Sequence, residues 1–369
     1  MNKLDELIAE FCPDGVEFAK LGDCCAIEDN KRKPIKASER TTGKTPYYGA
    51  NNIQDYVDGF THDGEYVLIA EDGSSSLDNY SIQCVSGKFW ANNHVHVVKG
   101  NEELNSRFLY HFLTTFNFVP YLVGGTRAKL NRASMIKIPI PLPPLPVQNE
   151  IVRILDNFTE LTAELTAELT ARKKQYEYYR KELLTFTDDV KKVPLIDVVK
   201  IKRGVRVVKS QLAVEGEYPV FQNSMTPLGY MDKANCTGDT AFIITAGAAG
   251  EIGYTDNDFW AADDCFSFEC PQYLKSKYLY YILLCQKNTI YSKVRKASIP
   301  RLPRSAIEKL IIPVPNVDIQ EKIVDVLDRF DTLCNDISKG LPAEIEARQK
   351  QYEYYRDKLL TFKESSDEN

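Results

Sequence analysis

The chain has 369 residues, of which 43% are hydrophobic and 27% charged, and its formal net charge at neutral pH is −6. A chain of this length is too long for one ordinary core and suits two globular domains with connecting helices. It contains no apolar run long enough to cross a membrane, and its first residues do not resemble a signal peptide. Nine scattered cysteines without a CxxC pair indicate reduced thiols rather than a zinc site. We therefore expect a cytoplasmic protein.

The first part of the chain is predicted to hold a short helix followed by a mixed sheet. Residues 1–20 have one apolar helical face and reach a turn at Pro13. From 21 to 146, short β-branched and aromatic runs alternate with Gly, Ser, Asn and Asp turns, which is typical of strands. A helix is expected at 106–116. The run IPIPLPPLP at 138–146 predicts a rigid extended segment, because proline is excluded from helix interiors and central strands.

A long helix is predicted for residues 148–186. Apolar side chains recur there at spacings of three and four over about five heptads, the pattern of a helix with a coiled-coil partner. Its last sixteen residues, 171–186, read ARKKQYEYYRKELLTF. Thirteen of these sixteen positions are identical in ARQKQYEYYRDKLLTF at 347–362. Such agreement indicates an internal duplication.

The second copy of the helix is predicted to contain a local break. The apolar spacing lengthens from three to four between Leu341 and Ile345, which is a stutter in a heptad pattern, and Gly340 and Pro342 stand at the same place. The matching region of the first helix, 162–169, reads TAELTAEL, a four-residue unit present twice.

The segments that precede the two helices are also related, although they have diverged further. Gly73 matches Gly247, and FWA at 89–91 matches FWA at 259–261, with the order of matches preserved. Two domains that share one fold and perform related tasks are therefore expected. The predicted boundaries are 1–147 for the first domain with its N-terminal helix, 148–186 for the central helix, 187–317 for the second domain and 318–369 for the C-terminal helix and tail.

Two short motifs suggest cofactor sites but fit them poorly. TTGKT at 41–45 resembles the end of a phosphate-binding loop, yet Ser38 stands where the first glycine of that loop is required. His94 and His96 could share one strand face, but no third metal ligand is apparent, so ordinary strand alternation is preferred. We expect neither a metal site nor a catalytic residue on this chain.

Basic clusters stand out against the overall negative charge. Two of them, at 121–137 and 291–309, occupy equivalent places in the duplicated halves, and further clusters lie at 200–209 and 31–36. Clusters of this kind are typical of surfaces that neutralise DNA phosphates. A solvated basic face is the alternative for any single cluster, and recurrence in both halves argues against it.

Polar loops with residue types that read base edges occur in both halves. They lie at 47–52 and 72–76 in the first half and at 221–224 and 245–250 in the second. Ordinary turn chemistry is the alternative for any one of their residues. The candidate DNA-binding side chains are Tyr47, Asn51, Asn52, Ser74, Ser75, Arg127, Lys129, Asn131, Arg132, Lys202, Arg203, Arg206, Gln222, Asn223, Arg295, Lys296, Arg301 and Arg304.

Together these features resemble the specificity subunit of type I restriction-modification systems. They are the QYEYYR and LLTF helix endings, the proline-rich segments that precede Gln148 and Gln320, the tandem TAEL units and two variable domains that each precede a helix. The resemblance covers essentially the whole chain, and the helix endings are its most specific part.

The resemblance implies a non-catalytic subunit with an α+β fold. It would have two tandem target-recognition domains, each a mixed β-sheet with helices, separated by two long helices that pair as an antiparallel coiled coil. Each domain would read one half of a split, asymmetric double-stranded DNA target. The chain itself would carry no cofactor. The helices would dock two modification subunits that bind S-adenosylmethionine, and restriction subunits would add ATP and Mg.

The same helices supply the candidate residues for partner docking. Their apolar stripes give a seam that is repeated in both copies. The candidates for the helix seam and partner docking are Leu165, Leu169, Tyr176, Tyr179, Leu183, Phe186, Ile345, Tyr352, Tyr355, Leu359 and Phe362.

The TAEL units suggest a way to set the spacing between the half-sites. One more unit would lengthen the helix by about 6 Å and turn it by about 40°. We expect this change to alter the unread spacer by about one base pair and to leave both half-sites unchanged.

Two other functions stay open from the sequence. A methyltransferase or nuclease that acts alone is poorly supported, because no GxSxG, HExxH or GxGxxG motif occurs, and a methylation assay would separate it. A coiled-coil scaffold without nucleic acid is the structural alternative. Absence of salt-dependent DNA binding in a partner complex would favour that scaffold.

Overall fold

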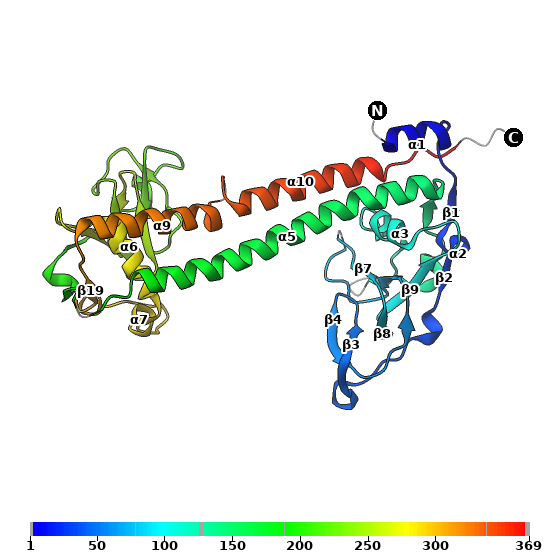
Figure 1. Ribbon diagram of the computed structural model, residues 1–369, viewed down its shortest axis with the longest axis horizontal. Helices are drawn as coiled ribbons and strands as arrows, with labels where there is room; N and C mark the ends of the chain where they lie inside the picture. The colour runs from blue at the N-terminus through cyan, green and yellow to red at the C-terminus, as the bar shows by residue number, and fades with distance from the viewer. Residues whose placement is uncertain (1–2, 78, 125–127, 188, 337, 366–369) are drawn as a thin grey trace. The chain divides into compact units, whose positions relative to one another are not determined.

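The computed structural model describes residues 3–77, 79–124, 128–187, 189–336 and 338–365. The chain divides into two compact units, each of which combines sheets with parts of the long helices (Figure 1). The first unit comprises Met1–Leu165 and Ile345–Asn369, and the second comprises Thr166–Glu344. Within the described ranges, no helix is both long enough and apolar enough to span a membrane.

The first unit is built around an antiparallel sheet with the strand order β2-β9-β6-β7. Its central strand β6 is buried along its whole length, because Val67 and Ile69 pack into the core with α3 (Ser106–Leu113) on one face, and Tyr66 and Leu68 pack against Phe89 of β8 on the other. A second sheet has the order β4-β3-β8-β5 and contains one parallel pair, β3 with β8. The strands are β1 Phe18–Lys20, β2 Cys25–Ile27, β3 Thr42–Tyr48, β4 Ile53–Val57, β5 His62–Asp63, β6 Tyr66–Ala70, β7 Ile82–Val85, β8 Lys88–Ala91, β9 Val95–Gly100 and β10 Pro139–Pro141.

The second unit repeats this plan. Its antiparallel sheet has the order β12-β18-β15-β16, and its second sheet, β14-β13-β17, again contains one parallel pair. Trp90 of β8 and Trp260 of β17 take the same place in the two parallel pairs. The strands are β11 Lys192–Pro194, β12 Lys200–Arg203, β13 Tyr218–Phe221, β14 Tyr230–Met231, β15 Thr240–Ile244, β16 Ile252–Thr255, β17 Trp260–Ala261, β18 Cys265–Glu269 and β19 Ile311–Pro313.

The helices cover the antiparallel sheets in equivalent ways. The helix expected at 106–116 is confirmed as α3, Ser106–Leu113, and its counterpart in the second unit is α6, Ser276–Cys285. The proline-rich segments contain β10 and β19, which pair with β1 and β11. The extended prediction for 138–146 is wrong at its end, because Leu145 and Pro146 already form the first turn of α5, where proline is tolerated. The remaining helices are α1 Lys3–Phe11, α2 Leu21–Cys24, α4 Arg132–Met135, α5 Leu145–Leu183, α7 Lys287–Ser292, α8 Arg304–Glu308, α9 Val317–Asn335 and α10 Leu341–Leu359. The predicted α+β class with two tandem domains is therefore confirmed.

A buried glutamine fixes each domain to the start of its long helix. Gln148 is 0% exposed; its Oε1 accepts a hydrogen bond from Asn105 N (2.8 Å), and its Nε2 donates to Glu103 O and Pro143 O (both 2.7 Å). Gln320 makes the same three bonds in the second unit, at 2.8 to 2.9 Å. Because a buried amide needs partners for both its oxygen and its nitrogen, this side chain sets where the helix begins relative to the loop before it.

The long helix α5 contributes its first part to the first unit and its second part to the second unit. In the first unit, α10 runs antiparallel to it (Figure 1), and in the second unit Phe330 of α9 lies against Tyr176 and Tyr179. The helix ends at Leu183, so Phe186, predicted as its last residue, lies beyond its end, as Phe362 does beyond α10. Both phenylalanines nevertheless pack against the cores of their units.

The C-terminal region forms two helices rather than one, at the place where the stutter is found. The helix α9 ends at Asn335, and α10 begins at Leu341 with Pro342 as its second residue. Between them Asp336 Oδ1 accepts from Ser338 N (2.7 Å) and Lys339 N (3.2 Å). A side chain at Gly340 would approach the carbonyl oxygen of Thr332 to 2.4 Å, so glycine is needed for this close return of the backbone.

Candidate nucleic-acid interface

The basic segment of the second unit is folded back on itself as a short loop, residues 292–304, here called the second basic loop. Arg295 and Arg301 exchange both backbone hydrogen bonds, at 2.8 and 3.1 Å. The loop is then attached to the polar loop at 245–250 by Leu302 N to Thr245 O (2.8 Å) and Gly247 N to Pro300 O (3.2 Å). The structure thus places one predicted basic cluster directly beside one predicted polar loop.

The polar loop at 245–250 also meets the loop at 221–224. Ala248 N donates to Asn223 O at 2.8 Å. Gly247 has a φ of +78°, and a Cβ there would lie 2.8 Å from that same oxygen, which explains the glycine. Asn223 itself is exposed, whereas Gln222 is half-buried, with its Nε2 3.5 Å from Asp263 Oδ1. Three segments far apart in sequence therefore form one surface.

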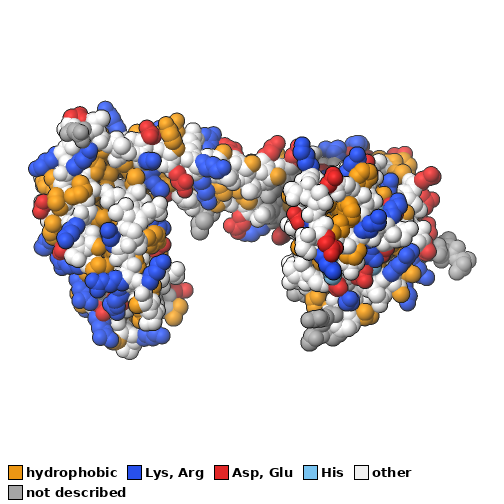
Figure 2. All heavy atoms as spheres, turned by 90° about the horizontal axis from the view of Figure 1, so that it is seen from below, with side chains coloured by type: hydrophobic (Ala, Val, Ile, Leu, Met, Phe, Trp, Pro, Cys, Tyr) orange, Lys and Arg blue, Asp and Glu red, His pale blue; other side chains and the backbone are white. Residues whose placement is uncertain are grey.

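A cleft of about 350 Å³ opens at this surface. Arg203, Arg295 and Arg301 line it, so the cluster at 200–209 and the second basic loop meet there. Arg203 Nε donates to Asp263 O at 3.1 Å, and Arg301 lies 3.9 Å from Asp264 Oδ1. Figure 2 shows Lys and Arg side chains gathered on the second unit, at the left. The surface is basic locally, despite the negative charge of the whole chain.

The other candidates of the second unit are exposed and weakly held. Arg304 Nε donates to Glu308 Oε1 (2.8 Å), and Lys202 is ion-paired with Glu269. Arg206 and Lys296 are exposed. Exposed ion pairs contribute little to stability, so Arg304 and Lys202 can exchange their carboxylate partners for a DNA phosphate at low cost in free energy.

The first unit uses the same construction around Lys129. Val123 and Lys129 exchange both backbone hydrogen bonds at 2.8 Å, and Leu130 N donates to Glu71 O at 2.8 Å, as Leu302 does to Thr245 in the second unit. We call residues 128–132 the first basic loop. Arg132 is exposed at the start of α4, and Asn131 caps that helix by accepting from Ser134 N at 2.8 Å. Arg127 lies outside the described residues.

Several predicted contact residues of the first unit instead hold its loops together. Asn51 Nδ2 donates to Gly73 O (2.8 Å), and Asn51 Oδ1 accepts from Ser75 N (2.9 Å) and Ser81 Oγ (2.5 Å). Ser74 Oγ donates to Ser76 O at 2.7 Å. Their polar atoms are therefore engaged inside the protein. Ser75 and Asn52 are exposed, although Asn52 Oδ1 accepts from Ile53 N at 2.8 Å.

The structure places Tyr47, one of the predicted DNA contacts, in the core. Its side chain is 1% exposed, its hydroxyl accepts from Ile35 N at 3.0 Å, and the Arg40 guanidinium lies 4.2 Å from its ring centre. The cause is strand alternation, which turns Tyr47 inward at the end of β3. Tyr47 therefore supports the loop that follows and offers no surface to DNA.

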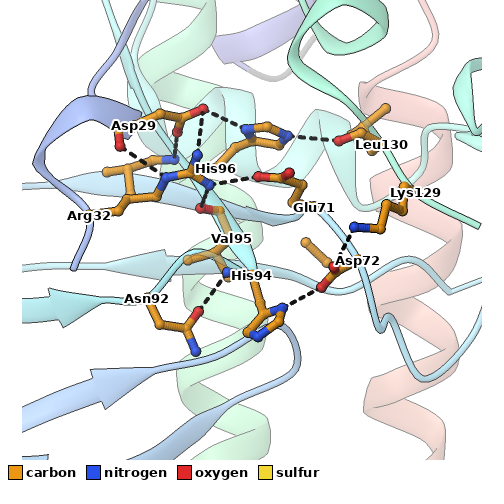
Figure 3. A network of polar contacts seen from close by, with 12 residues as sticks. Asp29, Arg32, Glu71, Asp72, Asn92, His94, Val95, His96, Lys129 and Leu130 are labelled. Carbon is orange, nitrogen blue, oxygen red and sulfur yellow. Dashed lines mark hydrogen bonds and ion pairs between the residues drawn. The ribbon is translucent and has the colours of Figure 1, made fainter. Parts of the chain in front are cut away.

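Asp72, the first residue of the predicted polar loop 72–76, lies beside the first basic loop, although it is not among the predicted DNA contacts. The carboxylate of Asp72 accepts from His94 Nδ1 (2.5 Å) and from Lys129 Nζ (3.0 Å), as Figure 3 shows. Partial burial alone would raise the pKa of Asp72, but these two partners lower it overall. Asp72 meets Lys129 because residues 72 and 129 form an isolated antiparallel β-bridge, and no sequence pattern predicts this contact.

The two short motifs are not cofactor sites in the described part of the chain. TTGKT runs into β3, an extended strand, rather than into a loop before a helix. His94 turns to Asp72, whereas His96 turns to Asp29, so the imidazoles do not share a ligand (Figure 3). No cluster of three His, Cys, Asp or Glu able to hold a metal occurs among the described residues.

The helix candidates divide into core and surface. Tyr176 is 6% exposed, while Tyr179 and Tyr355 are 38% and 40% exposed. Beside them Tyr178 and Tyr354, which occupy equivalent places, are 60% and 63% exposed. Leu165 and Ile345 are half-buried. The residues that pack against the two cores are Leu169, Leu183, Phe186, Tyr352, Leu359 and Phe362.

Comparison with known proteins identifies the duplicated region as a family domain. A model described as the type I restriction modification DNA specificity domain matches residues 13–172 and again 187–347. A putative type I restriction enzyme specificity subunit from Haemophilus influenzae is 46% identical over 94% of this chain and 96% of its own length. The specificity subunit of the EcoR124I/EcoR124II restriction enzyme from Escherichia coli is 30% identical over 98% of this chain and 97% of its own length.

Solved structures show the same fold. The crystal structure of a type I restriction-modification S subunit from M. genitalium has a TM-score of 0.66 at 16% identity, covering 94% of this chain and 95% of that one. A chain from a structural study of type I complex assembly and conformational transition has a TM-score of 0.57 at 16% identity, covering 94% and 98%.

Proposed function

The chain belongs to the family of type I restriction-modification DNA specificity proteins, and we propose that it selects the DNA target of such a system. Each unit reads one half of a bipartite, asymmetric double-stranded target. The helices dock modification subunits, which carry out the chemistry.

The observation that carries this proposal is the repeated basic loop. In both units a loop of paired backbone carries Lys or Arg, and an equivalent hydrogen bond ties it to the residue after the central strand: Leu130 N donates to Glu71 O in the first unit, and Leu302 N donates to Thr245 O in the second. The backbone support is the same, but the exposed side chains differ. They are Lys129 and Arg132 in the first unit, and in the second unit they are the arginines that line the cleft, Arg203, Arg295 and Arg301. Equivalent supports with unlike side chains suit a target with two unlike halves.

The proposal for the partners rests on the equivalent tyrosines of the two long-helix copies. Tyr178 and Tyr354 are large, exposed and in contact with Tyr179 and Tyr355, in edge-to-face pairs 5.5 and 5.3 Å apart. Exposed aromatic residues are typical of protein interfaces. Two equivalent faces would accept two copies of one modification subunit. S-adenosylmethionine, ATP and Mg would bind to partner subunits, and this chain would contribute no catalytic group. A cytoplasmic location stays a prediction.

The basic loops can be tested by charge removal in the complex with the modification subunit. We expect Arg301→Ala and Arg304→Ala to weaken DNA binding and to reduce the slope of log affinity against log salt by about one each. Lys322→Ala, on α9 outside the basic loops, is the matched control and should leave the slope unchanged. Equal slopes for all three variants would count against the second basic loop as the DNA surface. All three variants must still assemble with the modification subunit, so that the comparison reports on DNA binding alone.

A further inference from the structure

His96 is a buried residue whose two ring nitrogens both face hydrogen-bond acceptors. Its side chain is 1% exposed. Nδ1 lies 2.6 Å from Asp29 Oδ2, and Nε2 lies 2.8 Å from the carbonyl oxygen of Leu130 (Figure 3). A neutral imidazole has one N–H and one lone pair, so it can satisfy only one of these contacts. Both contacts together require the doubly protonated, positively charged ring.

The surroundings of His96 hold its partner Asp29 as a carboxylate. Asp29 Oδ1 accepts from Val97 N at 2.9 Å, and Arg32 lies 3.5 Å from Asp29 Oδ2. Burial alone would raise the pKa of Asp29, but its contacts with His96, Val97 and Arg32 lower it overall, which keeps the carboxylate charged. Arg32 is itself neutralised by Glu71, with NH1 2.8 Å from Oε2.

The carbonyl that His96 holds belongs to the first basic loop. Leu130 stands between Lys129 and Asn131, and its carbonyl has no other hydrogen bond among those found in the described chain. The remaining titratable groups beside the loop are Asp72, His94 and Tyr80; the Tyr80 hydroxyl donates to Ala70 O at 2.9 Å. The bond from His96 is therefore the side-chain tie between β9 and this loop.

The second unit lacks this device. His96 stands opposite Ile69 in its sheet, and Phe266 stands opposite Ile243 at the equivalent position. Phe266 lines the arginine cleft instead of bonding to the second basic loop. Loss of the charge on His96 should therefore act on the first unit alone.

We propose that protonated His96 is a positioning residue, which fixes Leu130 and so holds Lys129 and Arg132 in place to contact the first half-site. This inference rests on the proposed function. The tie needs an N–H at Nε2 while Nδ1 faces the Asp29 carboxylate. Reading of the second half-site is independent of this tie.

A proteolysis ratio tests the tie without DNA. The ratio is the rate of trypsin cleavage after Lys129 and Arg132 divided by the rate of cleavage after Arg301 and Arg304 in the same full-length chain. Differences in protease activity between samples cancel in this ratio. Cleavage in a folded loop follows its local opening. We expect this ratio to be roughly tenfold higher in His96→Phe than in the unmodified protein at the same pH, the loss expected for one charge-assisted hydrogen bond.

Two variants separate charge from structure. His96→Phe installs the residue of the second unit and removes both ring nitrogens, so the ratio should rise. Asp29→Asn offers an amide N–H to Nδ1, so a neutral ring can keep its Nε2–H on Leu130; the ratio should then stay as low as in the unmodified chain. An unchanged ratio in His96→Phe, or a raised ratio in Asp29→Asn, would overturn the proposal.

A second experiment measures DNA binding by the complex with the modification subunit, with a duplex obtained from a random pool. Discrimination against a substituted first half-site should be roughly tenfold lower in His96→Phe than in the unmodified chain, and discrimination at the second half-site should not change. An equal loss at both half-sites, or no loss at the first, would overturn the role of His96 in reading. Failure to recover any half-site would overturn the proposed function, and the proteolysis ratio would still decide whether His96 ties the loop.

Discussion

Phe158 of α5 stacks on Tyr355 of α10, with ring centroids 5.4 Å apart and planes inclined by 21°. Phe330 of α9 makes the equivalent contact with Tyr179 of α5, at 5.6 Å and 29°. Each phenylalanine stands ten residues after the buried glutamine of its unit, Gln148 or Gln320. The same aromatic contact is therefore made in both units. In each unit the phenylalanine comes from one copy of the duplicated helical region and the tyrosine comes from the other copy.

We expect this contact to couple energetically. In a double-mutant cycle of Phe158→Ala and Tyr355→Ala, the coupling energy should be about 0.5 to 1.5 kcal/mol, the range for stacked aromatic pairs. The chain has two tryptophans, Trp90 and Trp260. In a Trp260→Phe background, denaturant unfolding followed by Trp90 fluorescence reports on the first unit. A coupling energy near zero would contradict a direct role for the stacking contact.

The buried glutamines should be among the most sensitive positions of the chain. Gln148→Leu removes the partners of Asn105 N, Glu103 O and Pro143 O, so we expect it to lower the free energy of unfolding of the first unit by about 3 kcal/mol. Gln320→Leu should do the same in the second unit. Gln351→Leu, on the exposed face of α10, is the control and should change stability by less than about 0.5 kcal/mol. A small effect of Gln148→Leu would mean that water or a shifted backbone replaces these bonds.

The stabilisation that Glu150 provides, in part through Lys3 of α1, should be lost at acid pH. Hydrogen bonds from Arg153 and Lys3 lower the pKa of Glu150 from 4.5 to about 2. Because the pKa in the folded protein is the lower one, this stabilisation is present above about pH 4.5 and is lost as the pH falls toward 2. Both cations are largely exposed, so we expect Glu150→Gln to cost only about 1 kcal/mol at pH 7. The stability difference between the two proteins should disappear near pH 2, and a constant difference would exclude the ion pairs as its cause.

Asp72 should restrain the DNA affinity of the first unit. Its carboxylate holds the Lys129 ammonium at 3.0 Å, and a DNA phosphate has to compete with it. We expect Asp72→Asn to raise affinity for non-target DNA several-fold and to steepen the salt dependence. Asp55→Asn makes the same charge change at a carboxylate that pairs with Arg40. If both variants raise affinity equally, net charge rather than release of Lys129 is responsible.

Much of the architecture could be predicted because it is repeated in the sequence. The duplication, the long helix, the proline-rich segments and the break near Gly340 are all local patterns. Side-chain roles were harder to predict, because they depend on strands that pair across long separations. Asn51 has a typical base-reading side chain, but its amide is taken up by Gly73 and Ser75. In the same way, Asp72 and His96 gain their roles only where β6 and β9 meet the first basic loop.

Split recognition by the two units is tested by selecting bound duplexes from a random pool with this chain reconstituted with a modification subunit. We expect two short, unlike sequences at one fixed spacing. Insertion of one TAEL unit should lengthen that spacing by about one base pair while leaving both sequences unchanged. Recovery of a single contiguous site, or of no enriched sequence at all, would contradict the assignment of one half-site to each unit.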